Sequence, residues 1–346
     1  MRLPSPLGIS GPSLWLPPER QSGAEAVASG LVDAETAGEL GYSALPVAAL
    51  APPEMAVEAG REALSAAGVD PAAVGLLLHA WIHYQGHDLW SPPHFVADRL
   101  GADGAVPLGV QQVCNGGAAA VELAASRLFV EPGLEHALVT TADAFPDPGF
   151  DRWSGDYGIG YGDGATALVL HHLPENGGGR PADLVLHAVT TVAAPRLERM
   201  HRGDDPFGPA ARSLGPKVDI RRTKKAFLRD GGMEAFTEAS GASLRTVVRR
   251  CLAEAGLSAA DKPLRYVVAP RLGRKTVDLA YAPPLSELTG AELLRPGADT
   301  GHLGAGDAAA SLAELHARRM LGPGEYALVV SAGAGFTWSC LLVSGA

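Results

Sequence analysis

The sequence is poor in cysteine. Only Cys114, Cys251 and Cys340 occur among 346 residues. They form no metal-ligand spacing, and an odd number leaves one thiol over, so neither a disulfide framework nor a cysteine metal site is expected. Such usage is typical of a reducing cytoplasm. We therefore expect a cytoplasmic protein with no permanently bound metal or cofactor.

Positive charge and long apolar runs are also scarce. Lys and Arg number 28 against 38 Asp and Glu, which gives a formal net charge of −10. A nucleic-acid partner needs a broad basic face, so that class of partner is disfavoured. No stretch is long enough to span a membrane, and the start of the sequence has no apolar run resembling a signal peptide. One basic run, 217–225, indicates either a solvated face or a contact for a phosphate or an acidic carrier protein.

Hydrophobic residues are abundant, at 47%, so the chain can bury a large core as one domain or as two fused halves. Apolar runs alternate with helical patterns, which predicts α/β layers. A glycine-rich connection is expected at 177–179. Helices are predicted over 54–67, 93–100 and 116–130, and strands over 74–80, 106–112, 137–142, 165–170, 266–268 and 336–343.

An internal repeat appears when the sequence is shifted by 190 positions against itself. Alanines 118–120 then fall on 308–310, and the apolar run 137–139 falls on 327–329. This predicts two pseudo-duplicated halves, 1–176 and 177–346. Cys114 lands on Gly304, so a pseudo-twofold axis would make the loop 301–307 face the loop around Cys114.

Cys114 is the candidate nucleophile because it stands between the predicted strand 106–112 and the predicted helix 116–130. The start of a helix presents unpaired N–H groups and a positive dipole end, which favour a thiolate. The alternative is a small core residue, as the apolar surroundings of Cys251 and Cys340 indicate for those two. Gly116 and Gly117 are expected to leave room for a substrate carbonyl.

Several motifs occur in one order along almost the whole chain. They are 8–11 with 16–18, 63–69 before 74–78, Val113-Cys114-Asn115-Gly116-Gly117, Tyr161-Gly162-Asp163-Gly164-Ala165, and 331–338. In this order they resemble the ketoacyl-ACP synthase III-like enzymes of the thiolase superfamily. The resemblance implies a five-layer αβαβα fold and a homodimer. It also implies that acyl groups arrive on the phosphopantetheine arm of CoA or of an acyl carrier protein.

The sequence departs from the condensing members of that family at two loops. Those members join the cysteine to a histidine and an asparagine, but the loop 269–274, where the histidine is expected, contains none. His302 stands in the place of the asparagine, and Asp307 begins the next helix. This loop resembles a branch of acyltransferases from specialised metabolism, in which Cys, His and Asp act in acyl transfer.

The resulting hypothesis is an acyltransferase in secondary-metabolite biosynthesis. Cys114 would carry the acyl group as a thioester, and His302 would activate a small-molecule alcohol or amine. Asp307 would either orient His302 or contact the incoming nucleophile. Two alternatives remain: a decarboxylative β-ketoacyl synthase that forms carbon–carbon bonds, and a degenerate, noncatalytic ketosynthase partner subunit.

Further residues are candidates for binding substrate. Arg271 and Arg274 would bind the phosphates of CoA or of a carrier protein, or Arg271 would orient an acidic substrate; the alternative is that both are solvated. His83 and Trp90 follow the strand 74–80 and would line a substrate channel. Asp163, between two glycines, is expected to fix a turn rather than to take part in catalysis.

Overall fold

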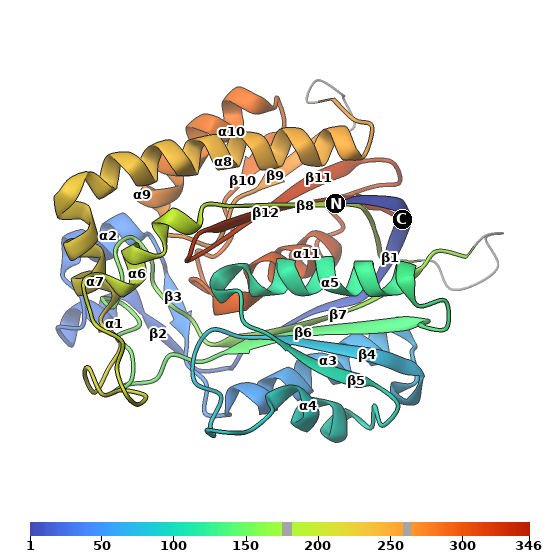
Figure 1. Ribbon diagram of the computed structural model, residues 1–346, viewed down its shortest axis with the longest axis horizontal. Helices are drawn as coiled ribbons and strands as arrows, with labels where there is room; N and C mark the ends of the chain where they lie inside the picture. Colours follow the sequence, from blue (N-terminus) through green and yellow to red (C-terminus); the bar gives the residue numbers. More distant parts are fainter. Residues whose placement is uncertain (175–181, 259–263) are drawn as a thin grey trace.

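The computed structural model describes residues 1–174, 182–258 and 264–346. Within these residues, ten strands form one sheet in the order β10-β9-β11-β12-β8-β1-β7-β6-β4-β5 (Figure 1). The strands are β1 (Arg2–Trp15), β4 (Val74–Ala80), β5 (Val106–Val110), β6 (His136–Asp143), β7 (Gly164–His172), β8 (Leu184–Ala193), β9 (Leu264–Val268), β10 (Glu292–Leu294), β11 (Tyr326–Gly333) and β12 (Thr337–Gly345).

The two halves of the sheet share one topology. The first half runs β5-β4-β6-β7-β1 and the second β10-β9-β11-β12-β8. In each, the first three strands are parallel and the last two pairings are antiparallel. The shift of 190 positions carries the bounds of β6 onto those of β11. This topology agrees with the predicted duplication; the proposed boundary after residue 176 and the connection 177–179 lie outside the described residues.

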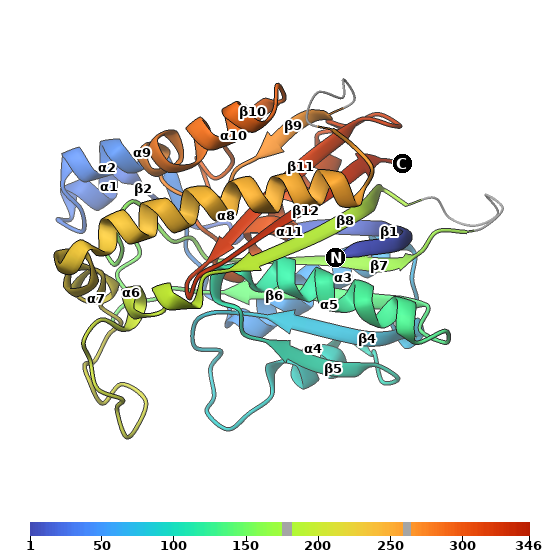
Figure 2. The same ribbon diagram turned by 45° about the horizontal axis from the view of Figure 1, so that its top comes forward.

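Helices separate the sheet into layers. In Figure 1, α5 (Gly116–Val130) and α11 (Asp307–Ala317) lie between the two halves of the sheet. The outer faces are covered by α3 (Pro52–Ala67) and α4 (Pro92–Leu100) on one side, and by α8 (Met233–Glu254) and α10 (Ala282–Leu288) on the other; Figure 2 shows α8 crossing the second half of the sheet. The arrangement is the predicted αβαβα fold.

The alternation of side chains along the strands explains why the layers form. In β6, Ala137 and Val139 face the middle helices, while Leu138 faces α3 and α4. In β11, Val329 faces the middle layer and Leu328 faces α8. Since both faces of these strands are buried, their sequences are continuous apolar runs rather than alternating ones.

Shorter elements make up the rest of the described chain, and several of them line the site described below. They are β2 (Arg20–Ser22), α1 (Gly23–Ala28), α2 (Ala34–Leu40), β3 (Ala44–Pro46), α6 (Arg199–Arg202), α7 (Ile220–Phe227) and α9 (Arg274–Thr276). Single turns of 3₁₀ helix occur at Pro71–Ala73, Val113–Asn115, Pro195–Leu197 and Gly304–Gly306, and π-helical turns at Leu228–Gly232 and Val277–Tyr281. In the part of the chain that the structure describes, every helix is too short or too polar to cross a membrane.

Candidate active site

Cys114 lies on the 3₁₀ turn Val113–Asn115, which leads directly into α5. The residue before it, Val113, has a φ of 49°. A β-branched residue in this left-handed region is strained, and such strain is concentrated at functional sites, where the surrounding structure holds it. Asn115 anchors the turn from the other side, because its Nδ2 donates to Ser339 Oγ at 2.9 Å. The thiol is therefore presented on a tightly fixed turn.

The glycines that follow Cys114 serve a purpose other than the predicted one. A Cβ on Gly117 would lie 2.6 Å from the carbonyl oxygen of Ala305, and one on Gly116 would lie 3.1 Å from Ala305 Cβ. The space beside them is filled by the turn Gly304–Gly306, not left open for a substrate carbonyl. Small residues at the start of α5 thus allow the two duplicated loops to meet, as the repeat predicted.

His302 and Asp307 are brought together by the loop that precedes α11. His302 Nδ1 lies 2.7 Å from Asp307 Oδ2, and both side chains are buried. Asp307 also accepts hydrogen bonds from the backbone N–H of Leu303 at 2.9 Å and of Arg271 at 3.1 Å. Three donors occupy the carboxylate, which lies outside the cavity that Cys114 and His302 line. Its position therefore favours orientation of His302 over contact with a nucleophile.

The charges of Asp307 and Cys114 both act on the pKa of His302. Burial by itself would lower the pKa of His302, but the charges of Asp307 and Cys114 and the hydrogen bond to Asp307 raise it well above its ordinary value. Burial would raise the pKa of Asp307, yet His302 and Arg271 hold it below the usual range. The pair therefore favours an imidazolium beside a carboxylate when Cys114 is a thiolate.

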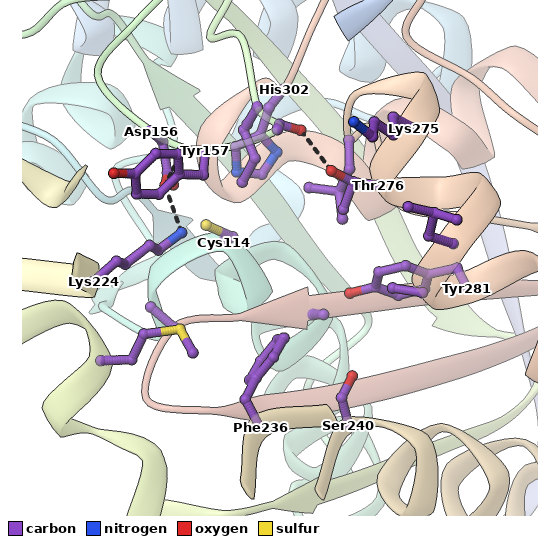
Figure 3. Close-up of a pocket in the computed structure, with 18 of the residues that line it drawn as sticks. Cys114, Asp156, Tyr157, Lys224, Phe236, Ser240, Lys275, Thr276, Tyr281 and His302 are labelled. Carbon is purple, nitrogen blue, oxygen red and sulfur yellow. Dashed lines mark hydrogen bonds and ion pairs between the residues drawn. The ribbon is translucent and has the colours of Figure 1, made fainter. Parts of the chain in front are cut away.

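The second ring nitrogen of His302 is the one available for chemistry. Nε2 is buried and has no partner at good hydrogen-bonding geometry within the described residues. Cys114 and His302 line the same cavity, and Figure 3 shows both side chains beside it. With Nδ1 bonded to a carboxylate, a neutral ring has its proton on Nδ1 and its lone pair on Nε2.

Arg271 occupies the loop position where a histidine was expected, and its placement corrects the prediction of a phosphate contact. Its side chain is 0% exposed and lies outside the cavity wall. Nη1 donates to Thr300 Oγ1 at 3.0 Å, and Nη2 forms an ion pair with Glu314 at 3.0 Å without hydrogen-bond geometry. Arg271 supports the loop of His302 and cannot reach a donor's phosphate.

A buried carboxylate also fixes the loop that faces Cys114. Asp143, at the end of β6, accepts the backbone N–H of Ile82 and His83 through Oδ1 and that of Ala305 through Oδ2, all within 2.9 Å. Burial raises its pKa to about 7, despite these hydrogen bonds. Asp143 therefore connects the loop after β4 to the turn before α11.

The cavity beside Cys114 has a volume of about 620 Å³. This is in the range of small-molecule sites. Helices α2, α6, α7, α8 and α9 contribute to its wall, together with the end of β11 and the turn that leads from it to β12. Most of its lining is apolar: Leu40, Ile159, Met200, Leu228, Met233, Phe236, Leu272, Leu279, Ala280, Ala332, Ala334 and Phe336.

Three other predicted binding residues lie away from this cavity. His83 packs between Phe145 and Phe150, at ring-centroid distances of 5.8 and 5.9 Å. Trp90 lies over a separate hollow with His87, and Arg274 donates to the carbonyl of Gly38 at 2.7 Å on the exterior. These placements correct the expectation that His83 and Trp90 line the channel to Cys114.

Sequence reasoning missed a polar group on the cavity wall, formed by Asp156, Lys224 and Tyr161. Lys224 Nζ lies 2.5 Å from Asp156 Oδ1 (Figure 3). Tyr161 donates to Asp156 Oδ2 at 3.0 Å. Lys224 belongs to the basic run 217–225, which gave the only hint of it. By contrast, Asp163 accepts hydrogen bonds from Ala48 and Phe145 and does not line the cavity, as expected for a turn.

Comparison with known proteins places this chain in a family. Residues 252–344 match the family described as 3-oxoacyl-[acyl-carrier-protein (ACP)] synthase III C terminal. A β-ketoacyl-[acyl-carrier-protein] synthase III from Rhizorhabdus wittichii is 29% identical over 295 residues, which cover 84% of this chain and 82% of that protein.

Solved structures extend the likeness to the whole chain. ChlB3, described as an acyltransferase, is 32% identical, covers 98% of both chains and has a TM-score of 0.85. A 3-oxoacyl-[acyl-carrier-protein] synthase III from Aquifex aeolicus is 18% identical, covers 98% of this chain and 99% of its own, and has a TM-score of 0.76, which supports the fold alone. The chain belongs to the ketoacyl-ACP synthase III-like proteins of the thiolase superfamily, a family of enzymes that use acyl thioesters of CoA or carrier protein.

Proposed function

We propose that the protein is an acyltransferase that moves an acyl group from acyl-CoA or acyl carrier protein, through a thioester on Cys114, to a small-molecule alcohol or amine. The observation that carries the proposal is the connected set Cys114, His302 and Asp307, with Arg271 in place of the loop histidine. The likeness to the acyltransferase ChlB3 supports it. Secondary-metabolite biosynthesis and a homodimer remain part of the same proposal.

In the first half-reaction of the proposed mechanism, Cys114 acts as a thiolate beside the imidazolium of His302. The Cys114 thiolate attacks the thioester carbon of the donor, the bond to the pantetheine sulfur breaks, and that sulfur leaves as a thiol after taking the Nε2 proton of His302. The imidazolium of His302 balances the charge of Cys114 until the attack. The backbone N–H of Cys114 would stabilise the oxyanion that develops on the carbonyl.

The second half-reaction begins with a change in His302. An acylated sulfur has no charge, so one of the influences that raise the pKa of His302 is removed. The lower pKa lets the ring lose its Nε2 proton to the departing pantetheine thiolate, so that His302 is neutral with a free lone pair on Nε2, while Asp307 keeps the other proton on Nδ1. The acceptor's O–H or N–H gives its proton to Nε2 as the acceptor attacks the thioester carbon. The carbon–sulfur bond breaks and returns Cys114 as a thiolate.

Decarboxylative condensation is less well supported by these residues. It requires two donors that stabilise an enolate, and the positions expected to supply them hold Arg271 and His302. Arg271 is turned into the protein interior, and His302 is occupied by Asp307 on one side. A base that faces the thioester is sufficient for transfer to an alcohol or amine. It does not supply the two donors that an enolate requires.

Two measurements test the proposal. Intact-mass spectrometry after incubation with a panel of acyl-CoA thioesters should show one acyl adduct, which is absent in Cys114→Ala; no adduct would favour a noncatalytic partner subunit. In a second experiment, malonyl-CoA is added to the acylated protein. Release of carbon dioxide with a β-keto product would favour condensation and overturn the proposed transfer.

A further inference from the structure

The polar group on the cavity wall has no role in the steps described above. Asp156 and Lys224 form an ion pair in which Asp156 is 1% exposed and the Lys224 side chain 12% exposed. They come from different parts of the chain, a loop before β7 and helix α7. Taking two such charges out of water costs more than their attraction usually returns, so stability alone is a weak reason for the pair.

Lys224 retains hydrogen-bonding capacity toward the cavity. An ammonium has three N–H donors and no acceptor. Asp156 takes up one of them, and the carboxylate is otherwise occupied by the N–H of Tyr157 and the hydroxyl of Tyr161. His201 lines the same cavity, and its Nδ1 is buried with no protein partner among the described residues. Burial and the charge of Lys224 lower the pKa of His201 to about 4, so this ring is neutral.

A single side chain, that of Tyr161, connects the Asp156 and Lys224 pair with the proposed base His302. The hydroxyl of Tyr161 bonds to Asp156, and the Tyr161 ring packs edge-on against His302 at 5.2 Å between centroids. Tyr161 thus reaches from the partner of Lys224 to the base, and an acceptor of about that length is the size to test for one that bonds to Lys224 and attacks the acyl group on Cys114. A single six-membered ring with two functional groups has that size.

The charges on the cavity wall define the chemistry of such a molecule. Its charged lining residues outside the Cys114 and His302 pair are Asp156, Lys224, Glu39 and Lys275, and they form two ion pairs. A carboxylate or an ammonium on the acceptor would find no unpaired opposite charge on the cavity wall. Burying a charge without such a partner is costly. An oxygen that accepts a hydrogen bond from Lys224 has no such cost.

We infer that Lys224, held by Asp156, and His201 form a subsite that binds an oxygen atom of the acceptor. The acceptor is then an uncharged molecule with two oxygen groups, one that attacks the thioester and one that bonds to Lys224. This inference rests on the proposed acyl transfer and narrows its acceptor from alcohols and amines to neutral alcohols with a second oxygen.

The test compares acceptors that differ by one group. The protein is first acylated with whichever of acetyl-, hexanoyl- and benzoyl-CoA gives the highest yield of Cys114 adduct. Transfer is then measured to cyclohexanol, to the cyclohexane-1,2-, 1,3- and 1,4-diols, and to trans-4-aminocyclohexanol. We expect at least one diol to exceed cyclohexanol in kcat/KM by roughly tenfold or more, the effect of one hydrogen bond to a charged group, and to exceed the amine as well.

Variants assign this preference to the subsite. Lys224→Met should reduce the diol-to-cyclohexanol ratio to about one, as should the charge-neutral double variant Asp156→Asn with Lys224→Met, which avoids leaving a buried carboxylate unpaired. Lys225→Met removes the same charge from the exposed face of α7 and should keep the wild-type ratio. The ratio is independent of how much protein folds or is acylated.

Each failure has its own meaning. Absence of both Cys114 adduct and product in the wild type would overturn the proposed function and, with it, this inference. Transfer without any preference for a diol, or with preference for the amine, would overturn the subsite alone. The same holds if the double variant keeps the wild-type ratio, or if Lys224→Met slows acylation while leaving the ratio unchanged, which would assign Lys224 to the donor.

Discussion

Replacement of Asp307 by Asn tests the proposed base most directly, because it keeps the shape of the side chain and removes its charge. The carboxylate accepts three hydrogen bonds, of 2.7 Å from His302, 2.9 Å from Leu303 and 3.1 Å from Arg271. An amide has one oxygen, so in either orientation its NH₂ group meets a backbone N–H donor. The lost bond should lower the free energy of unfolding by about 1–3 kcal/mol.

The orientation of the amide sets the size of the kinetic effect. If its oxygen faces His302, Nδ1 keeps its proton and only the charge is lost. If its NH₂ group faces His302, the proton moves to Nε2 and the lone pair that serves as base disappears. Between these limits, transfer from acylated Cys114 should slow roughly 10²- to 10⁴-fold.

The assay is a single turnover followed by quenching and intact-mass spectrometry, which reports formation and loss of the Cys114 adduct separately. Asp163→Asn is a matched control, since Asp163 is also a buried carboxylate that accepts backbone N–H groups but does not line the cavity. It should lose stability without a selective loss of transfer. Transfer by Asp307→Asn within about threefold of wild type would refute the proposed role of the His302 and Asp307 pair.

Other expectations follow from the same contacts. Cys251→Ala should keep the acyl adduct that Cys114→Ala loses, because Cys251 lies on the buried face of α8, against the sheet; an adduct on Cys251 in mass mapping would contradict this. The stabilising effect of the raised His302 pKa is fully present below its unfolded value of 6.5 and is lost as pH rises through the folded value. The stability difference between wild type and His302→Ala should therefore narrow as the pH rises above about 6.5 in urea titrations, and a constant difference would argue against the ion pair of His302 and Asp307. Arg271→Met breaks a buried pair whose partner, Glu314, is 26% exposed, so we expect a loss of about 2–3 kcal/mol in urea unfolding, and a loss below about 1 kcal/mol would contradict its structural role.

The fold could be predicted well from the sequence because its central strands are buried on both faces. A run such as 74–80 is apolar except for His79, and β4 has those bounds. The prediction for α3 began two residues late, at Glu54, because Pro52 and Pro53 were not recognised as a helix start. Proline is tolerated there, where its missing N–H has no partner to lose.

The candidate site could be predicted only where its residues are neighbours in sequence or are related by the repeat. His302 and Asp307 are five positions apart, and the shift of 190 placed their loop opposite Cys114. Asp156 and Lys224 are 68 positions apart and meet only through tertiary packing. Arg271 was taken for a surface residue because its partners, which make its burial tolerable, are remote in sequence.

The duplicated architecture explains why the two facing loops contribute different groups. Position 304 corresponds to Cys114, but Gly304 has a φ of 64°, and a Cβ there would lie 2.1 Å from Asp143 Oδ2. A second nucleophile is therefore excluded by both backbone conformation and space. Asp143 instead holds the turn against the start of α5, and the loop supplies its functional group two residues earlier, at His302. Two similar halves thus form one asymmetric site, with the thiol from the first half and the base with its orienting carboxylate from the second.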